Sequence, residues 1–343
     1  MDYKILDNKE VKVIKSKSFN HFFDKKTGFA ATWGEKKEDD PDFCPIGPLI
    51  LDIEVTTKCN GVPQKDGVKR PCAFCYKSNT PVGINMYFET FKMIIDKFPK
   101  TLGQVAIGAD SESTSNPDLW KMMEYCRSKN IIPNITTANI TDETADNLAK
   151  YCGAVAVSRY EDKNLCYDSV KKLTDRGMTQ VNIHQLVAKE TLAMCLETIE
   201  DIKTDPRLAK LNAIVFLGLK NKGKRNTLTC TDDSDYKKIV DKCLESKINF
   251  GFDSCSANKF LRITGDKFKQ VAEPCESTCF SSYSNAEGKF FPCSFMEETG
   301  DWVEGLDLVE CKDFMNDIWN NPKTIKFRDN LIKCGRNCPL YRI

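Results

Sequence analysis

Residues 49–59 decide how this chain is interpreted, and they read Leu-Ile-Leu-Asp-Ile-Glu-Val-Thr-Thr-Lys-Cys. The apolar run up to Val55 is typical of a buried strand. Cys59 closes the stretch, and Cys72 and Cys75 follow after a spacer of twelve residues. Three neighbouring thiolates can bind three irons of a cubane [4Fe–4S] cluster and leave one iron open to a ligand that is not protein. The pattern therefore predicts redox chemistry at the end of a strand.

The composition narrows the class of protein. Net charge is +1 over 343 residues, so the chain as a whole offers no electrostatic attraction for nucleic acid or for an anionic membrane. We find no apolar stretch of the ~20 residues that a membrane span requires and no signal peptide, and we expect a cytoplasmic enzyme. The chain contains seventeen cysteines but only two histidines. Without an export signal, metal binding through sulfur is favoured over a disulfide framework.

The middle of the chain alternates strand-like runs with helical patterns, as expected for βα units and a parallel sheet. The expected strands are Leu49–Val55, Gln104–Gly108, Ile131–Thr137, Ala154–Ser158, Gln180–Val187, Ala213–Leu219 and Ile248–Asp253. This rhythm predicts an α/β fold, a partial (β/α)6-type TIM barrel. In such barrels the chemistry lies on loops at the carboxyl ends of the strands, where Cys59 falls.

Two flanking regions break the rhythm, and we expect three parts. Residues 1–48 form an N-terminal extension with a hairpin near Lys25–Gly28, which either binds a leader peptide or covers one end of the barrel. Residues 49–253 form the barrel. Residues 254–343 form a loop-rich, cysteine-rich module that holds seven of the seventeen cysteines.

The run Cys72-Ala73-Phe74-Cys75 resembles the radical S-adenosylmethionine (SAM) superfamily, in which an aromatic residue also precedes the last cysteine. The family spacing between the first two cysteines is shorter, so residues 60–71 are interpreted as an inserted loop. Loop-closure entropy rises slowly with length, and a long spacer does not forbid the cluster. The alternative at this place is a zinc site built on Cys72 and Cys75.

The resemblance also implies SAM contacts at successive strand ends. By position, the candidates are Phe74, Gly108, Ala109, Asp110, Glu112, Thr137, Asn139, Ser158, Arg159 and Gln185. Either Asp110 or Glu112 would take the place of the family acid that holds the SAM amino group. Strand alternation puts Asn182 and His184 on one side and Gln185 on the other. No residue is assigned a catalytic role beyond these contacts.

The C-terminal module resembles the SPASM or twitch modules that carry auxiliary clusters. Cys275 is followed after twelve residues by Gly288, and Cys293 follows that glycine after four more. We expect one auxiliary [4Fe–4S] cluster bound by Cys255, Cys275, Cys293 and Cys338, with Cys279 and Cys334 as reserves. A structural zinc site with four cysteine ligands is the alternative.

Together these features imply a radical SAM oxidoreductase that cleaves SAM to a 5′-deoxyadenosyl radical and abstracts a hydrogen atom from its substrate. The expected substrate is a peptide or protein, modified by oxidation, thioether or other crosslinking, or epimerisation. The expected reductant is a flavodoxin or ferredoxin. A small-molecule or nucleotide substrate is the alternative within this class. A non-catalytic zinc or iron–sulfur protein is the alternative outside it.

Overall fold

The structure is a computed structural model that describes residues 2–64 and 66–341. Its main sheet runs β13-β12-β11-β10-β9-β8-β5 through parallel neighbours, so each strand lies beside the one that precedes it in the chain. These strands are β5 (Ile50–Glu54), β8 (Gln104–Gly108), β9 (Ile132–Thr137), β10 (Val155–Ser158), β11 (Val181–Val187), β12 (Ala213–Gly218) and β13 (Phe250–Phe252). The predicted partial barrel is confirmed, with strand bounds within about two residues of those expected from the sequence.

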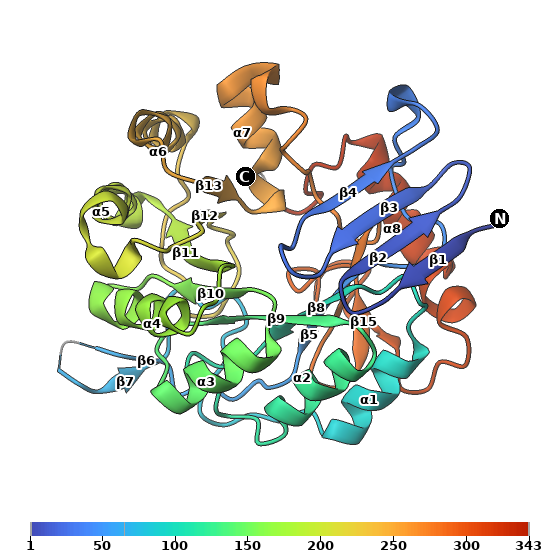
Figure 1. Cartoon of the computed structure of the whole chain (residues 1–343), viewed down its shortest axis with the longest axis horizontal. Helices are drawn as coiled ribbons and strands as arrows, with labels where there is room; N and C mark the ends of the chain where they lie inside the picture. Colours follow the sequence, from blue (N-terminus) through green and yellow to red (C-terminus); the bar gives the residue numbers. More distant parts are fainter. Residues whose placement is uncertain (1, 65, 342–343) are drawn as a thin grey trace.

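A helix follows each strand of the main sheet from β5 to β12 and lies outside that sheet, as the arc of helices in Figure 1 shows. The helices are α1 (Phe88–Lys97), α2 (Leu119–Ser128), α3 (Asp142–Tyr151), α4 (Lys163–Asp175), α5 (Leu192–Thr204) and α6 (Asp233–Ser246). Strand alternation sets the two faces of the sheet. Leu51 and Ile53 are buried against the helices, whereas Asp52 between them is exposed on the concave side.

The barrel is open, because β5 does not pair with β13 but with a strand from the end of the chain. β14 (Ser281–Ser284) lies parallel to β5, and β15 (Lys289–Phe291) and β16 (Leu306–Asp307) extend the sheet antiparallel. The C-terminal region also contains α7 (Ala257–Thr264) and α8 (Pro322–Lys333). Part of the region expected to form a C-terminal module is thus continuous with the barrel sheet.

The N-terminal region forms a separate antiparallel sheet of β1 (Lys4–Asp7), β2 (Val11–Lys15), β3 (Asn20–Asp24) and β4 (Ala30–Trp33). The expected hairpin joins β3 to β4. Buried Lys12 on β2 donates hydrogen bonds to the carbonyl oxygens of Lys100 (2.9 Å) and Leu102 (2.5 Å), just before β8 begins. This contact puts the sheet at the amino-terminal end of the barrel strands, opposite the end that carries Cys59.

The N-terminal sheet and α8 lie side by side in Figure 1. A small core joins them, in which Ile14 and Phe19 pack with Leu331 and with Cys275 and Cys279. Shorter elements complete the fold: β6 (Val62–Pro63), β7 (Lys69–Arg70), the 3-10 turns Lys37–Asp39, Lys189–Thr191, Pro206–Leu208, Ser254–Ser256 and Gly265–Phe268, and the π-helical turn Met315–Trp319.

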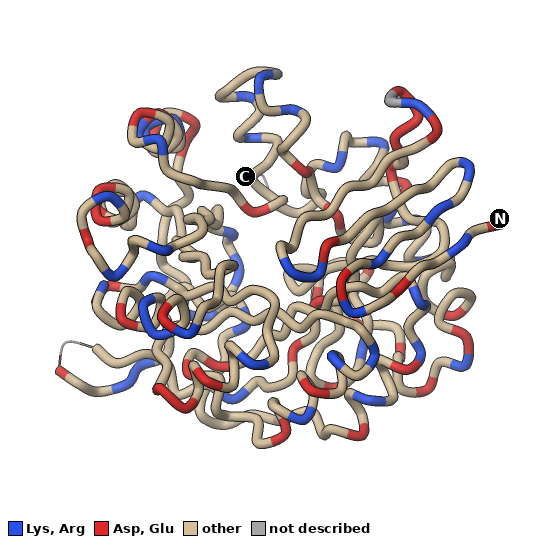
Figure 2. Tube along the Cα trace, in the orientation of Figure 1, with Lys and Arg blue, Asp and Glu red and all other residues tan. Residues whose placement is uncertain are grey.

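Charged residues of both signs are interspersed along the whole trace in Figure 2, in keeping with the net charge of +1. Within the described residues, no helix is long and apolar enough to cross a membrane.

Candidate functional site

The first cysteine group lies beyond the carboxyl end of β5. All three thiols are partly buried, and the backbone N–H of Cys75 donates to the carbonyl oxygen of Cys72 (3.2 Å). Burial raises the pKa of the Cys72 thiol to about 11. The nearby hydroxyl of Tyr160 opposes this rise, and the charges of Cys75 and Cys59 add to it. The thiols of Cys59 and Cys75 therefore lie within electrostatic range of the Cys72 thiol.

The two ends of the inserted segment, residues 60–71, lie next to each other. Gly61 has a φ of +81°, and a Cβ atom on it would lie 1.9 Å from the carbonyl oxygen of Arg70. Such an approach is possible only for glycine. Between these residues, β6 and β7 pair as a short antiparallel hairpin. The insertion is thus a hairpin whose ends meet, and it returns Cys72 to the neighbourhood of Cys59.

The turn after β8 is tied to the cysteine loop and to the end of β9. Ser111 Oγ donates to the carbonyl oxygen of Gly61 (2.6 Å), and Thr137 Oγ1 donates to the carbonyl oxygen of Ser111 (2.9 Å). These bonds hold the ends of three neighbouring strands together at one edge of the sheet. Gly108 and Ala109 precede this turn, and Gly108 is exposed.

The two candidate carboxylates at this edge differ in their partners. Asp110 is buried and accepts hydrogen bonds from the backbone N–H groups of residues 112, 114 and 115 (3.3, 3.0 and 2.9 Å). Its carboxylate therefore holds the turn itself. Glu112 points toward other loops, where Lys69 Nζ lies 2.6 Å away and Asn139 Nδ2 lies 3.5 Å away. The structure brings Glu112 and Asn139 together, and their assignment to SAM stays a prediction.

Phe74 and Ser158 gather around an aromatic residue that sequence reasoning missed. The ring of Phe74 stacks on the ring of Tyr160, with centroids 5.7 Å apart. Burial raises the pKa of Tyr160 well above its ordinary value, and its hydroxyl lies near the side chains of Cys72 and Ser158. The signal available in the sequence was an aromatic residue just past the fourth strand, at the end where the chemistry was expected.

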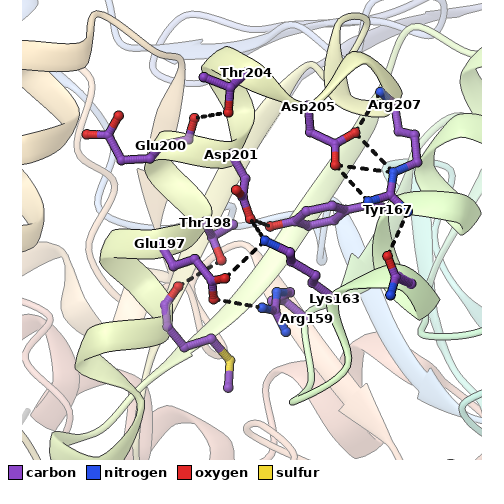
Figure 3. A network of polar contacts seen from close by, with 12 residues as sticks. Arg159, Lys163, Tyr167, Glu197, Thr198, Glu200, Asp201, Thr204, Asp205 and Arg207 are labelled. Carbon is purple, nitrogen blue, oxygen red and sulfur yellow. Dashed lines mark hydrogen bonds and ion pairs between the residues drawn. The ribbon is translucent and has the colours of Figure 1, made fainter.

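Arg159 and Gln185 point to the other face of the sheet. Arg159 lies on the helix side, with Nη2 3.3 Å from Glu197 on α5, in the network of Figure 3. Gln185 is fully buried and accepts a hydrogen bond from Thr198 Oγ1 on α5 (3.4 Å). Their assignment to SAM stays a prediction, and their placement does not support it. An open pocket of about 400 Å³ beside this network is lined by Arg159, Glu161, Asp162, Lys163 and Glu197.

The four cysteines that the sequence assigns to the second group lie within electrostatic range of one another, and their role as cluster ligands stays a prediction. Burial raises the pKa of the Cys255, Cys275 and Cys293 thiols to about 12. The charges of Cys275 and Cys338 add to the raised pKa of Cys255, and those of Cys255 and Cys338 add to the raised pKa of Cys293. The charges of Cys293 and Cys338 likewise add to the raised pKa of Cys275. Each of these four thiols therefore influences the others electrostatically.

The reserve cysteines are placed differently. Cys279 is buried and neighbours Cys275, but it also faces Arg336 and Arg328. Cys334 is exposed, and its thiol lies 3.2 Å from the carbonyl oxygens of residues 331 and 337. Among the described residues, no three cysteine, histidine, aspartate or glutamate side chains are drawn together around the position of a single metal ion.

A buried ionic network joins the two cysteine loops on the concave side of the sheet. Lys77, two residues after Cys75, lies 3.0 Å from Glu54 Oε2 and forms a close ion pair with Glu297. Its Nζ also donates to the hydroxyl of Tyr283 on β14 (2.9 Å). Burial raises the pKa of Glu54, although Lys77 opposes the rise. The network fastens the loop of Cys75 to β5, to β14 and to the loop after Cys293.

Asp52 lies two residues before Glu54 on β5, and both side chains are on the concave side of the sheet. It faces Tyr283 on β14 and Ala106 on β8 in the strand register. Within the described part of the chain, its carboxylate has no hydrogen-bond donor or cation as a partner. The protein around it limits its hydration and raises its pKa to about 6. Water still reaches this face, because Asp52, Gly108 and Thr136 are exposed.

Comparison with known proteins identifies the fold. No protein-family model matches the chain, and no curated protein matches it. The crystal structure of Streptococcus suis SuiB aligns over 94% of this chain and 90% of its own, with a TM-score of 0.69 at 14% identity. The chain has the SuiB fold. The resemblance drawn from the sequence is thereby confirmed at the level of the fold.

Two further SuiB structures align with the chain. SuiB bound to its precursor peptide SuiA covers 95% of this chain and 90% of its own, with a TM-score of 0.70 at 14% identity. SuiB bound to S-adenosylmethionine covers 82% of this chain and 68% of its own, with a TM-score of 0.63 at 16% identity.

Proposed function

We propose that this protein is a radical SAM enzyme that binds a [4Fe–4S] cluster through Cys59, Cys72 and Cys75 and SAM at the open iron. The observation that supports this proposal is that Cys59 and Cys75 lie within electrostatic range of Cys72 beyond the carboxyl end of β5, in a chain with the SuiB fold. When bound, the cluster and SAM supply a 5′-deoxyadenosyl radical that abstracts a hydrogen atom from the substrate.

The residues around the thiols orient them and limit water. The hydroxyl of Tyr160 lies beside the Cys72 sulfur, and the ring of Phe74 stacks on Tyr160. Such partners set the orientation and electronic properties of cluster ligands. Of the two acids, Glu112 is our choice to bind the SAM amino group. The carboxylate of Asp110 holds its own turn through backbone N–H groups, whereas the partners of Glu112 are the side chains of Lys69 and Asn139 on other loops. The end of β9, with Thr137 and Asn139, completes this edge.

We assign Cys255, Cys275, Cys293 and Cys338 to one auxiliary [4Fe–4S] cluster. Four protein ligands leave no open iron, so this cluster would carry electrons rather than bind substrate. The substrate we propose is a peptide, modified by oxidation, crosslinking or epimerisation, with electrons from a flavodoxin or ferredoxin. Two observations support a peptide: SuiB has been crystallised with its precursor peptide, and the concave face of the sheet is accessible at Asp52, Gly108 and Thr136.

The decisive experiment is anaerobic reconstitution followed by an assay for SAM cleavage. The protein should be brown, bind roughly eight irons, and convert SAM to 5′-deoxyadenosine on reduction. Cys72→Ala should abolish cleavage, whereas Cys230→Ala, a partly buried thiol outside both groups, should leave it intact. Colourless, zinc-loaded protein that leaves SAM unchanged would refute the proposal.

A further inference from the structure

The loop after β12 lies between the two cysteine groups and contacts both. We call residues 220–225 the connecting loop; they read Lys-Asn-Lys-Gly-Lys-Arg. Tyr76, next to Cys75, stacks on Phe295, two residues after Cys293, with ring centroids 4.3 Å apart. The connecting loop adds polar contacts on both sides of this aromatic pair. It therefore holds the place where the two cysteine loops touch.

Lys222 binds the backbone of the loop that follows Cys293. Its Nζ donates to the backbone carbonyl oxygens of residues 294, 295 and 297, at 3.4, 3.1 and 2.7 Å. Burial and the nearby Lys77 lower the pKa of Lys222, while Glu297 and Cys293 oppose this change. Three carbonyl acceptors use all the donors of one ammonium group. Lys222 thus fixes the backbone of this loop rather than making one exposed pair.

Lys220 faces the other side of the second cysteine group. It forms a buried ion pair with Asp253, and its Nζ lies 5.0 Å from the ring centroid of Phe295. Burial opposes protonation of Lys220, but the charges of Asp253, Cys255 and Cys338 outweigh it and raise the pKa. An ammonium group therefore stands beside the thiols that we assign to the auxiliary cluster.

The second half of the connecting loop holds the loop that follows Cys75. Gly223 has a φ of +102°, and a Cβ atom on it would lie 2.4 Å from the carbonyl oxygen of Cys75. The backbone N–H of Lys224 donates to Ser78 Oγ (2.8 Å). Arg225 donates to the carbonyl oxygens of residues 78 and 79, at 3.2 and 2.9 Å. The same short loop therefore binds backbone groups beside both cysteine groups.

We propose that the connecting loop couples the two sites: binding of the auxiliary cluster fixes the loop, and the fixed loop tightens the segment that carries Cys72 and Cys75. Lys222 and Arg225 act as positioning residues. By linkage, SAM bound at the first site strengthens cluster binding at the second. This inference rests on the proposed function for its cofactors, but the mechanical coupling is present in the protein alone.

The first test compares two variants of the connecting loop. Lys222→Met removes the three carbonyl contacts, whereas Lys224→Met makes the same change of charge at an exposed side chain. In the cluster-free protein, hydrogen exchange of residues 75–79 should be about tenfold faster in Lys222→Met than in wild type. Lys224→Met should match wild type, and Lys222→Arg should recover most of the protection. Equal exchange in Lys222→Met and Lys224→Met would overturn the inference.

The second test is a double-mutant cycle on reconstituted protein. Cys293→Ser should weaken SAM binding at the first site about tenfold in wild type, but have little further effect when Lys222→Met is present. SAM binding is read from its shift of the cluster's electron paramagnetic resonance signal. Simple additivity of the two changes would overturn the coupling. A wild type that loads clusters but binds no SAM would instead refute the proposed function, and the exchange test would still decide the inference.

Discussion

Removing the cation of the concave-side network is the sharpest test of how the structure is held together. Lys77 is 14% exposed and lies within 3.0 Å of Glu54, a carboxylate with a side chain 7% exposed, and also pairs with Glu297, 14% exposed. Lys77→Met keeps the length of the side chain and deletes its charge. Two buried carboxylates then face each other across Tyr283, which contacts both at 3.3 Å.

The expected loss of stability is about 3–5 kcal/mol, the range found when one partner of a buried ion pair is removed. A domain of ordinary stability, about 5–15 kcal/mol, would still fold. The loss should grow with pH. The pKa of Glu54 is already raised by burial, and without Lys77 it rises further. The folded state then binds a proton that the unfolded state has released, so stability falls as the pH rises above the unfolded value of 4.5.

Urea denaturation at pH 5 and at pH 8 measures both effects. The matched control is Lys237→Met, because Lys237 is 57% exposed and pairs with Asp241 one turn along α6. Such a helix pair contributes about 0.3–0.5 kcal/mol. Adding Glu297→Gln to Lys77→Met should recover part of the loss, since it removes one of the unpaired charges. A loss in Lys77→Met no larger than in the control, or one independent of pH, would refute the reasoning.

Two further predictions follow from single positions. Asp52→Asn should flatten the pH dependence of stability between about pH 4 and 6. The protein around Asp52 limits the hydration of its carboxylate and raises its pKa from 3.8 to about 6, so the folded wild type loses stability as the pH rises through this window. Urea unfolding at pH 4, 5, 6 and 7 checks this, and parallel curves for variant and wild type would contradict it. Gly61→Ala should separate the ends of the inserted hairpin, because the added Cβ would collide with the carbonyl oxygen of Arg70. The iron content of the first site should then fall while that of the second site is kept. Normal iron loading of both sites would contradict the role given to Gly61.

The barrel was predictable because its signals are local. Each strand carries its own alternation, so the run Leu49–Val55 predicted β5 and also which of its side chains are buried. The cysteines of both groups were predicted from their spacing and from their position after strands, and their role as cluster ligands stays a prediction. Alternation also predicted that Asn182 and His184 lie on the face opposite Gln185, which the hydrogen bond of Gln185 to α5 confirms.

What local pattern could not show is which distant segments pair. β14 lies beside β5 although about 230 residues separate them, and Tyr283 on β14 reaches Glu54 through a hydrogen bond. No periodicity within either segment specifies that pairing. Arg159 illustrates a different limit. It was assigned to SAM from its place at a strand end, but adjacent residues of a strand point to opposite faces, and Arg159 follows the buried, helix-facing side of β10.

The pairing of β14 with β5 explains why the second cysteine group forms where it does. Cys275 and Cys279 immediately precede β14, and Cys293 follows β15, so the position of the hairpin fixes the height of these thiols relative to the first group. Because β14 is parallel to β5, its carboxyl end lies at the same edge of the sheet as Cys59. The loop after β15 then returns to that edge, where Phe295 meets Tyr76. One register between two strands thus sets the distance between the two proposed clusters, and a shift of that register would move Cys275 and Cys293 relative to Cys59 and also separate Tyr283 from Glu54 and Lys77.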